Sequence, residues 1–195
     1  MQSLNQTSTM PSPSGWLKTY YLMRAAFSIV WIVAATSVAK QAPALAAILL
    51  VAYPAWDALA NYLDAQKAGG LGSNPTQFLN LVVSIVTAVA VAIALASGML
   101  PVIIVFGAWA ILSGLLQLAT AVRRWKSAGA QWVMVLSGAQ SAFAGAFFFK
   151  MALGTEPLSI VTVAPYAGFG AFYFLTSAVW LAVKDARQRQ ETIAC

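Results

Sequence analysis

Six long apolar stretches, each about as long as a bilayer is thick, fill most of this 195-residue chain. Hydrophobic residues make up 61% of the sequence and charged residues only 8%. A soluble domain of this size needs a largely polar exterior, because so much of its surface faces water. Lipid must therefore solvate most of these side chains, and the composition predicts an integral membrane protein.

The stretches predict an all-α membrane protein with six transmembrane helices. A spanning helix needs about 20 apolar residues to cross a hydrocarbon core of about 30 Å. Backbone polar groups inside lipid must be paired within the structure, and the stretches lack the alternation of barrel strands. The expected spans are 17–39, 42–63, 77–97, 100–122, 130–151 and 159–183. They form one domain, 16–184, between a disordered cytoplasmic tail at 1–15 and a cytoplasmic tail at 185–195.

The lengths of the links predict three helical hairpins in series. Only two residues separate the first span from the second and the third from the fourth, and Pro43 and Pro101 lie where the following helices begin. Proline suits the first turn of a helix, because its missing N–H is not needed there. The links at 64–76 and 123–129 are longer and polar. Helices joined by the shortest links should lie antiparallel and side by side.

The basic residues predict that both termini are cytoplasmic. Of the 11 lysines and arginines, only Lys40 and Lys150 fall on one side of the predicted spans. In membrane proteins, the loops on the cytoplasmic side carry an excess of basic residues, and this excess sets the orientation of the helices. Because these residues are scattered over short loops, they form no patch for nucleic acid, and the bilayer is the expected partner. The other nine are Lys18, Arg24, Lys67, Arg123, Arg124, Lys126, Lys184, Arg187 and Arg189.

The sequence argues against an enzyme. It has no histidine, one cysteine (Cys195) and five acidic residues. Histidine is the commonest metal ligand and the usual general base near neutral pH. These residues cannot assemble a usual zinc site or a Ser-His-Asp triad, and no glycine-rich phosphate-binding motif is present. We therefore expect no catalytic residues, no metal and no cofactor.

Polar residues inside the spans form a candidate intramembrane cluster. Asp57, Asn61 and Asp64 stand at i, i+4 and i+7, which places them on one face of the second helix. Arg24 lies at a similar depth in the first helix, and an unpaired charge there would be costly. We hypothesise an Arg24–Asp57 ion pair inside the membrane.

Asn80 in the third span and Gln117 in the fourth fall at a comparable depth, and Tyr20 could join them. The cluster could form a vestibule for protons or solutes that faces the cytoplasm, or it could only hold helices together at about 0.6 kcal/mol per hydrogen bond. Its predicted members are Arg24, Asp57, Asn61, Asp64, Asn80 and Gln117.

Small residues recur at helical spacing along two spans. Ser137, Ser141 and Gly145 follow one another every four residues in the fifth span, and Ala110 and Gly114 do so in the fourth. Such stripes let helix backbones approach closely. They predict either a tight bundle or a homo-oligomeric contact.

The second, fourth and sixth spans repeat one weak pattern, and the repeat leads to a family resemblance. Aligning Trp56 with Trp109 places Asp57 on Ala110. The run FGAWAILSGLLQLATAVRR, followed by WVMVLSGAQSAFAGAFF, resembles the short-repeat HdeD-like membrane proteins, with the motif LSG at 112–114 and 136–138. The resemblance implies a bacterial inner-membrane protein with six helices built from repeated hairpins and associated with acid resistance. It implies no catalytic residues.

Two functional interpretations follow. The first is a non-enzymatic inner-membrane protein of HdeD-like type that acts in acid or envelope stress tolerance. The second is a small transporter or proton-handling protein that uses the cytoplasm-facing polar cluster. In the second, protonation of Asp57 would break the pair with Arg24, an acid switch without histidine. The sequence identifies no small-molecule substrate.

Overall fold

A computed structural model of the chain describes residues 13–126 and 131–194, and this part of the chain is built from helices. Six of the helices are long and apolar enough to cross a membrane, which confirms the all-α fold class. Short 3-10 helices lie at Ala39–Gln41, Leu71–Ser73, Leu95–Ser97 and Ile160–Val163. The long helices are α1 (Pro13–Ser37), α2 (Pro43–Lys67), α3 (Pro75–Ala94), α4 (Met99–Arg123), α5 (Gln131–Ala152) and α6 (Ala164–Ala194).

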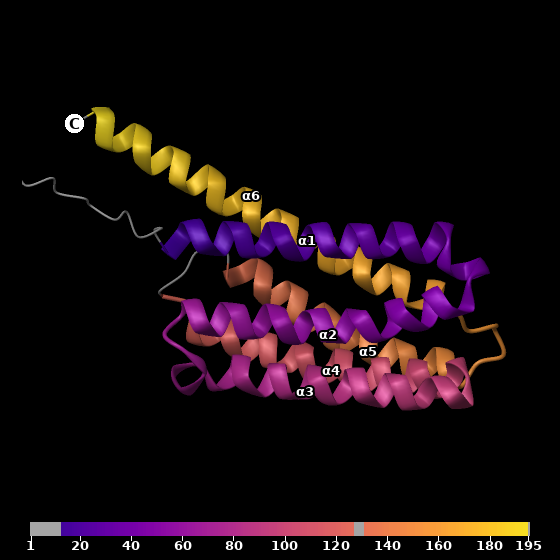
Figure 1. The fold of residues 1–195 in the computed structure, drawn as a ribbon. Coiled ribbons are helices and arrows are strands. Elements are labelled where there is room, and N and C mark those ends of the chain that lie inside the picture. The colour runs from indigo at the N-terminus through magenta and orange to yellow at the C-terminus, as the bar shows by residue number, and fades with distance from the viewer. Residues whose placement is uncertain (1–12, 127–130, 195) are drawn as a thin grey trace, which may run out of the picture.

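At both ends of the predicted domain, the helices extend further than the sequence predicted. The first helix already begins at Pro13, inside the predicted tail 1–15, and the rest of that tail lies outside the described residues. The last helix continues to Ala194 through the polar segment that follows the predicted span, and it projects past the other helices (Figure 1). An ion pair of 2.7 Å between Lys18 Nζ and Asp185 Oδ2 fastens this extension to α1.

Proline and glycine define several helix starts. Pro43 and Pro75 each occupy the first turn of their helix, as the sequence led us to expect for Pro43. The turn between α3 and α4 ends at Gly98, whose φ of 99° lies in the left-handed region that favours glycine. These breaks keep the links short, so that successive helices reverse direction.

The six helices form a ring in chain order. Each one contacts the next, and α6 closes the ring against α1. The start of α1, the link between α2 and α3, and the end of α6 lie at the same end of the bundle (Figure 1). The most extensive contacts join α4 to α5, α1 to α6 and α2 to α3. These pairs link different predicted hairpins, so the three hairpins are not the main packing units. A short link makes two helices neighbours, but side-chain size decides how closely they pack.

The close packing of α4 on α5 depends on glycines that face each other. A Cβ atom on Gly114 would lie 2.6 Å from the carbonyl oxygen of Gly138, and one on Gly145 would lie 2.5 Å from that of Gly107. Ala110 is fully buried at the same contact, and its carbonyl accepts a hydrogen bond of 2.9 Å from Ser141 Oγ. The predicted small-residue stripes therefore serve the bundle within one chain, where close packing replaces the hydrophobic effect as the driving force.

We predict that Gly145→Ala destabilises the protein by about 1–3 kcal/mol, because the added methyl group meets backbone atoms that cannot move aside. Gly168→Ala is the matched control: it also lies in a helix, and its Cβ would meet only the side chain of Ile32 at 3.9 Å. Thermal unfolding of the purified protein in detergent measures both. Equal melting temperatures for the two variants would contradict the packing described here.

Candidate functional site

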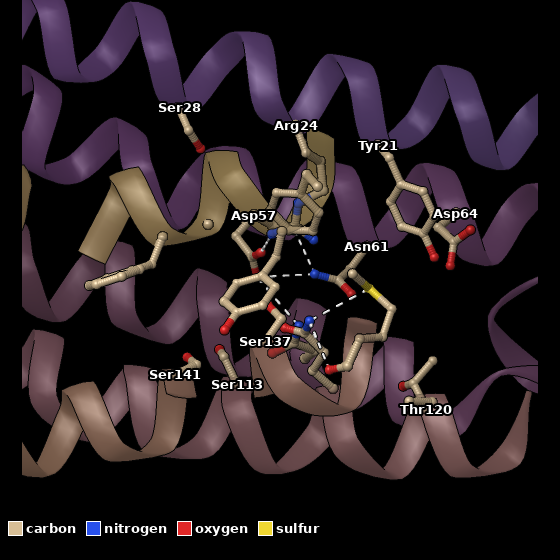
Figure 2. A pocket seen from close by; sticks show the side chains of 18 of the residues that line it. Tyr21, Arg24, Ser28, Asp57, Asn61, Asp64, Ser113, Thr120, Ser137 and Ser141 are labelled. Carbon is tan, nitrogen blue, oxygen red and sulfur yellow. Dashed lines mark hydrogen bonds and ion pairs between the residues drawn. The ribbon is translucent and has the colours of Figure 1, made fainter. Parts of the chain in front are cut away.

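The ring of helices surrounds a polar cavity of about 100 Å³, and all six helices line it (Figure 2). Its walls extend from the end of the bundle that carries most basic residues toward the middle. On α1 the lining side chains Tyr20, Arg24 and Ser28 are four residues apart, so that one face of the helix is turned inward. The outer faces carry exposed Leu, Ile, Val and Phe. The molecule therefore exposes apolar side chains on its outside and gathers polar ones around this cavity.

The hypothesised ion pair lies in the wall of this cavity. Arg24 Nη2 of α1 donates to Asp57 Oδ1 of α2. Their side chains are only 16% and 8% exposed. Two charges are tolerated at this depth because each neutralises the other and further hydrogen bonds complete their shells.

Asp57 accepts hydrogen bonds from three helices. Its Oδ2 accepts from Ser84 Oγ at 2.8 Å and from Asn61 Nδ2 at 3.0 Å, with Asn80 Nδ2 at 3.4 Å. Together with Arg24, every partner of the carboxylate is a donor. This set matches the ionised acid, which can only accept.

A neighbouring tryptophan fixes the direction of one of these bonds. Trp109 Nε1 of α4 donates to Ser84 Oγ at 3.0 Å. Since an indole N–H can only donate, the serine hydroxyl must direct its own proton to Asp57. The chain Trp109–Ser84–Asp57 therefore connects α4 through α3 to α2.

Arg24 has two further partners. Its Nη1 donates to Tyr20 Oη at 2.9 Å, and its guanidinium carbon lies 4.3 Å from the ring centre of Phe174 on α6. A cation above an aromatic face is attracted by the electron density of the ring. Arg24 is thus bound to α1, α2 and α6 at once.

A second ion pair lies nearer the basic end of the bundle. Arg124 Nη1, just after α4, donates to Asp64 Oδ2 of α2 at 2.8 Å. Gln77 Nε2 of α3 and Trp16 Nε1 of α1 approach the same carboxylate at 3.4 Å. Figure 2 shows Asp64 apart from the Arg24–Asp57 pair. Both acids of the cavity wall therefore carry an arginine partner.

The six predicted cluster residues all line this cavity, but they do not form one network. Asn61 and Asn80 join Arg24 and Asp57, whereas Asp64 belongs to the second pair. Gln117 is separate from both, since its amide donates to the carbonyl of Met134 on α5 at 3.5 Å.

Sequence reasoning missed several members of the two networks. Gln77, Asn80, Ser84 and Thr87 form a buried polar stripe, three or four residues apart, on the otherwise apolar α3. That spacing could have revealed Gln77 and Ser84. Arg124 was counted only as a loop residue, and nothing in the sequence signals the hydrogen bond of Trp109.

The serines of the α5 stripe border the cavity as well. Ser141 Oγ lies 2.9 Å from both the carbonyl oxygen of Ala110 and the hydroxyl of Tyr166, so it bridges α4 and α6. Ser137 is buried in the same wall. In the described part of the chain, no group of three Asp, Glu, Cys or His side chains gathers in a way that could hold a metal ion.

Comparison with known proteins identifies part of the chain. Residues 82–150 match the family described as "Short repeat of unknown function (DUF308)". This match confirms the resemblance to HdeD-like membrane proteins, and with the six candidate spans it indicates a multi-pass membrane protein. Neither the curated proteins nor the solved structures gave a significant match.

The DUF308 repeat covers the glycine-packed half of the ring. The matched residues include most of α3 together with α4 and nearly all of α5. Ser84 and Trp109 fall inside it, whereas Arg24, Asp57 and Asp64 precede it. The charged part of the cavity therefore lies mainly outside the matched repeat.

We predict that Asp57→Ala lowers the free energy of unfolding by about 3–5 kcal/mol, because it leaves the charge of Arg24 unpaired among helices. The double variant Arg24→Leu/Asp57→Leu should recover much of this loss, since it removes both charges. Lys18→Ala is the control: it breaks a more exposed pair and should cost about 0–1 kcal/mol. Unfolding in mixed micelles measures all three, and equal losses for Asp57→Ala and Lys18→Ala would refute the assignment.

Proposed function

We propose that this protein is a non-enzymatic inner-membrane protein that contributes to acid or envelope stress tolerance. The repeat match and the six candidate spans support the protein class, and the HdeD-like resemblance supports the physiological role. The observation that carries the proposal is the hydrogen-bond shell of Asp57, in which every partner donates.

This shell gives the ring a response to acid. Protonation would turn one oxygen of Asp57 from an acceptor into a donor that faces other donors. Arg24 cannot release its own proton to compensate, so its charge would remain with Tyr20 and Phe174. The charged groups nearby are already paired, because Arg124 neutralises Asp64. Acid would therefore weaken the attachment of α1 and α6 to α2 and α3.

The non-enzymatic assignment rests on the chemistry of the cavity wall. Its two carboxylates are each held by an arginine, and the hydroxyl of Ser84 donates to Asp57 while it accepts from Trp109. A nucleophile needs a neighbouring base with a free acceptor. None of these groups is arranged in that way.

We also propose that both termini are cytoplasmic. In the structure, the start of α1, the α2–α3 link and the end of α6 share one end of the bundle (Figure 1). Nine of the 11 basic residues belong to that side by the sequence, and the positive-inside rule assigns such a side to the cytoplasm.

The single cysteine provides a direct test of this orientation. We predict that Cys195 in spheroplasts reacts with a membrane-impermeant maleimide only after the membrane is permeabilised. A Cys195→Ala variant that carries Gly154→Cys, in the link between α5 and α6, should react without permeabilisation. The reverse pattern of labelling would place both termini outside.

The physiological role predicts a phenotype for Asp57. In a deletion strain challenged with acid, wild type should restore survival, whereas Asp57→Asn, which keeps the shape but cannot ionise, should not. Asp185→Asn is the matched control, because it removes an acid from an ion pair outside the cavity. Membrane abundance must be equal for all variants.

The outcomes separate the two functional interpretations. Equal rescue by wild type and Asp57→Asn would assign Asp57 to structure and favour a scaffold. Loss of rescue by Asp57→Asn alone would make Asp57 part of the mechanism, and flux through proteoliposomes would then separate an acid response of the ring from the movement of protons or solute. Normal acid survival of the deletion strain would remove the stress role.

A second candidate function is a small transporter or proton-handling protein. The observation that favours it is the cavity itself, which is polar, lies among all six helices and carries two charge pairs. Ionisable residues within a membrane usually belong to such solute or proton paths. A bundle held together only by packing would not need this interior.

A further inference from the structure

Four buried polar atoms of the cavity wall lack a hydrogen-bond partner among the described residues. They are Trp56 Nε1, Asn80 Oδ1, Ser113 Oγ and Gln140 Oε1, from α2, α3, α4 and α5. Asn80 and Ser113 are each only 7% exposed. Water or a ligand must satisfy such groups, because a bare polar atom inside a membrane protein is costly.

The paired charges of the cavity favour an uncharged ligand over an ionic one. Arg24 is neutralised by Asp57, and Asp64 is neutralised by Arg124. A charged ligand would have to break one of these pairs and leave its partner uncompensated. The four atoms named above belong to amide, hydroxyl and indole groups, which carry no charge.

The unpartnered atoms require both donors and acceptors from a ligand. The indole N–H of Trp56 needs an acceptor, while the carbonyl oxygens of Asn80 and Gln140 need donors. A hydroxyl group provides both functions on one oxygen, as does Ser113 itself. Aromatic rings add apolar parts to the wall. The ring centres of Tyr53 and Tyr166 lie 5.7 and 5.8 Å from that of Trp109. Such rings offer apolar faces to C–H groups.

We propose that the cavity binds a small uncharged polyol of about the size of glycerol. A volume of about 100 Å³ exceeds the roughly 10–15 Å³ that one water molecule requires, and it leaves room for only a few heavy atoms. This inference rests on the second candidate function, in which the protein handles a solute. It specifies the chemical class of that solute.

Two substitutions test the site in different ways. Gln140→Leu removes an unpartnered carbonyl at nearly constant volume, and Ser113→Leu fills the cavity from α4. The control is Leu112→Ala, on the same helix as Ser113 but 48% exposed on the outer surface. None of the three residues takes part in the ion pairs, so the ring should stay closed.

The probe is glycerol, and the measurement is saturation-transfer difference NMR on the full-length protein in nanodiscs, a method suited to weak ligands. We expect a saturable glycerol signal for wild type and Leu112→Ala, reduced about tenfold or more in both cavity variants, as a loss of about 1.4 kcal/mol would give. Erythritol should compete, and the zwitterion glycine should not. A signal no greater than that of empty nanodiscs would mean that water alone fills the cavity. Equal signals in all variants, or competition by glycine, would also overturn the proposal.

Flux measurements separate this inference from the function on which it rests. Glycerol entry into proteoliposomes, followed by light scattering, should be faster with wild type than with Gln140→Leu. Glycerol binding without entry would support the site and contradict a transporter. Proton entry without glycerol binding would support a proton-handling protein and overturn the polyol site.

Discussion

The Arg24–Asp57 ion pair is the interaction on which the arrangement of the ring depends. Through Asp57 it reaches α2 and α3, through Ser84 and Trp109 it reaches α4, and through Phe174 it reaches α6. Charges at this depth persist only where a protein supplies a counter-charge and donors. The need to neutralise two charges therefore requires helices that are distant in the sequence to meet at one point. The cavity is the space that remains around this meeting point.

The sequence predicted the features that follow from the thickness of the bilayer and from the depth of a residue in it, but not those that follow from side-chain packing. The thickness of a bilayer limits span length, so the six spans were predictable, and depth counted from the basic side placed Arg24 opposite Asp57. Helix pairing was not predictable from link lengths, because Gly114, Gly138 and their neighbours decide which backbones can approach. The partner of Asp64 was also missed, since Arg124 had an adequate explanation as a cytoplasmic loop residue.

The contacts between successive hairpins are formed in two different ways. Each extensive contact joins the second helix of one hairpin to the first helix of the next, as in α2–α3, α4–α5 and α6–α1. In the α4–α5 contact, Ala110 and Gly114 let the backbones meet. Aligned with them in α2 are Asp57, which accepts a hydrogen bond from Ser84 of α3, and Asn61, which donates to Asp57. Polar residues in place of small ones therefore join the helices by hydrogen bonds and leave a polar interior.

In the proposed acid response, this difference decides where a proton would act on the ring. The α4–α5 contact is made by facing glycines, backbone atoms and uncharged side chains such as Ser141, and none of these described groups titrates between neutral and acidic pH. By contrast, α1 and α2 make few backbone contacts with each other, and Arg24–Asp57 is the charged link between them. In that proposal, a proton on Asp57 would act at a contact with little other packing. The glycine-packed half would stay fixed while α1 and α6 moved, and such a movement would alter the shape of the cavity between them.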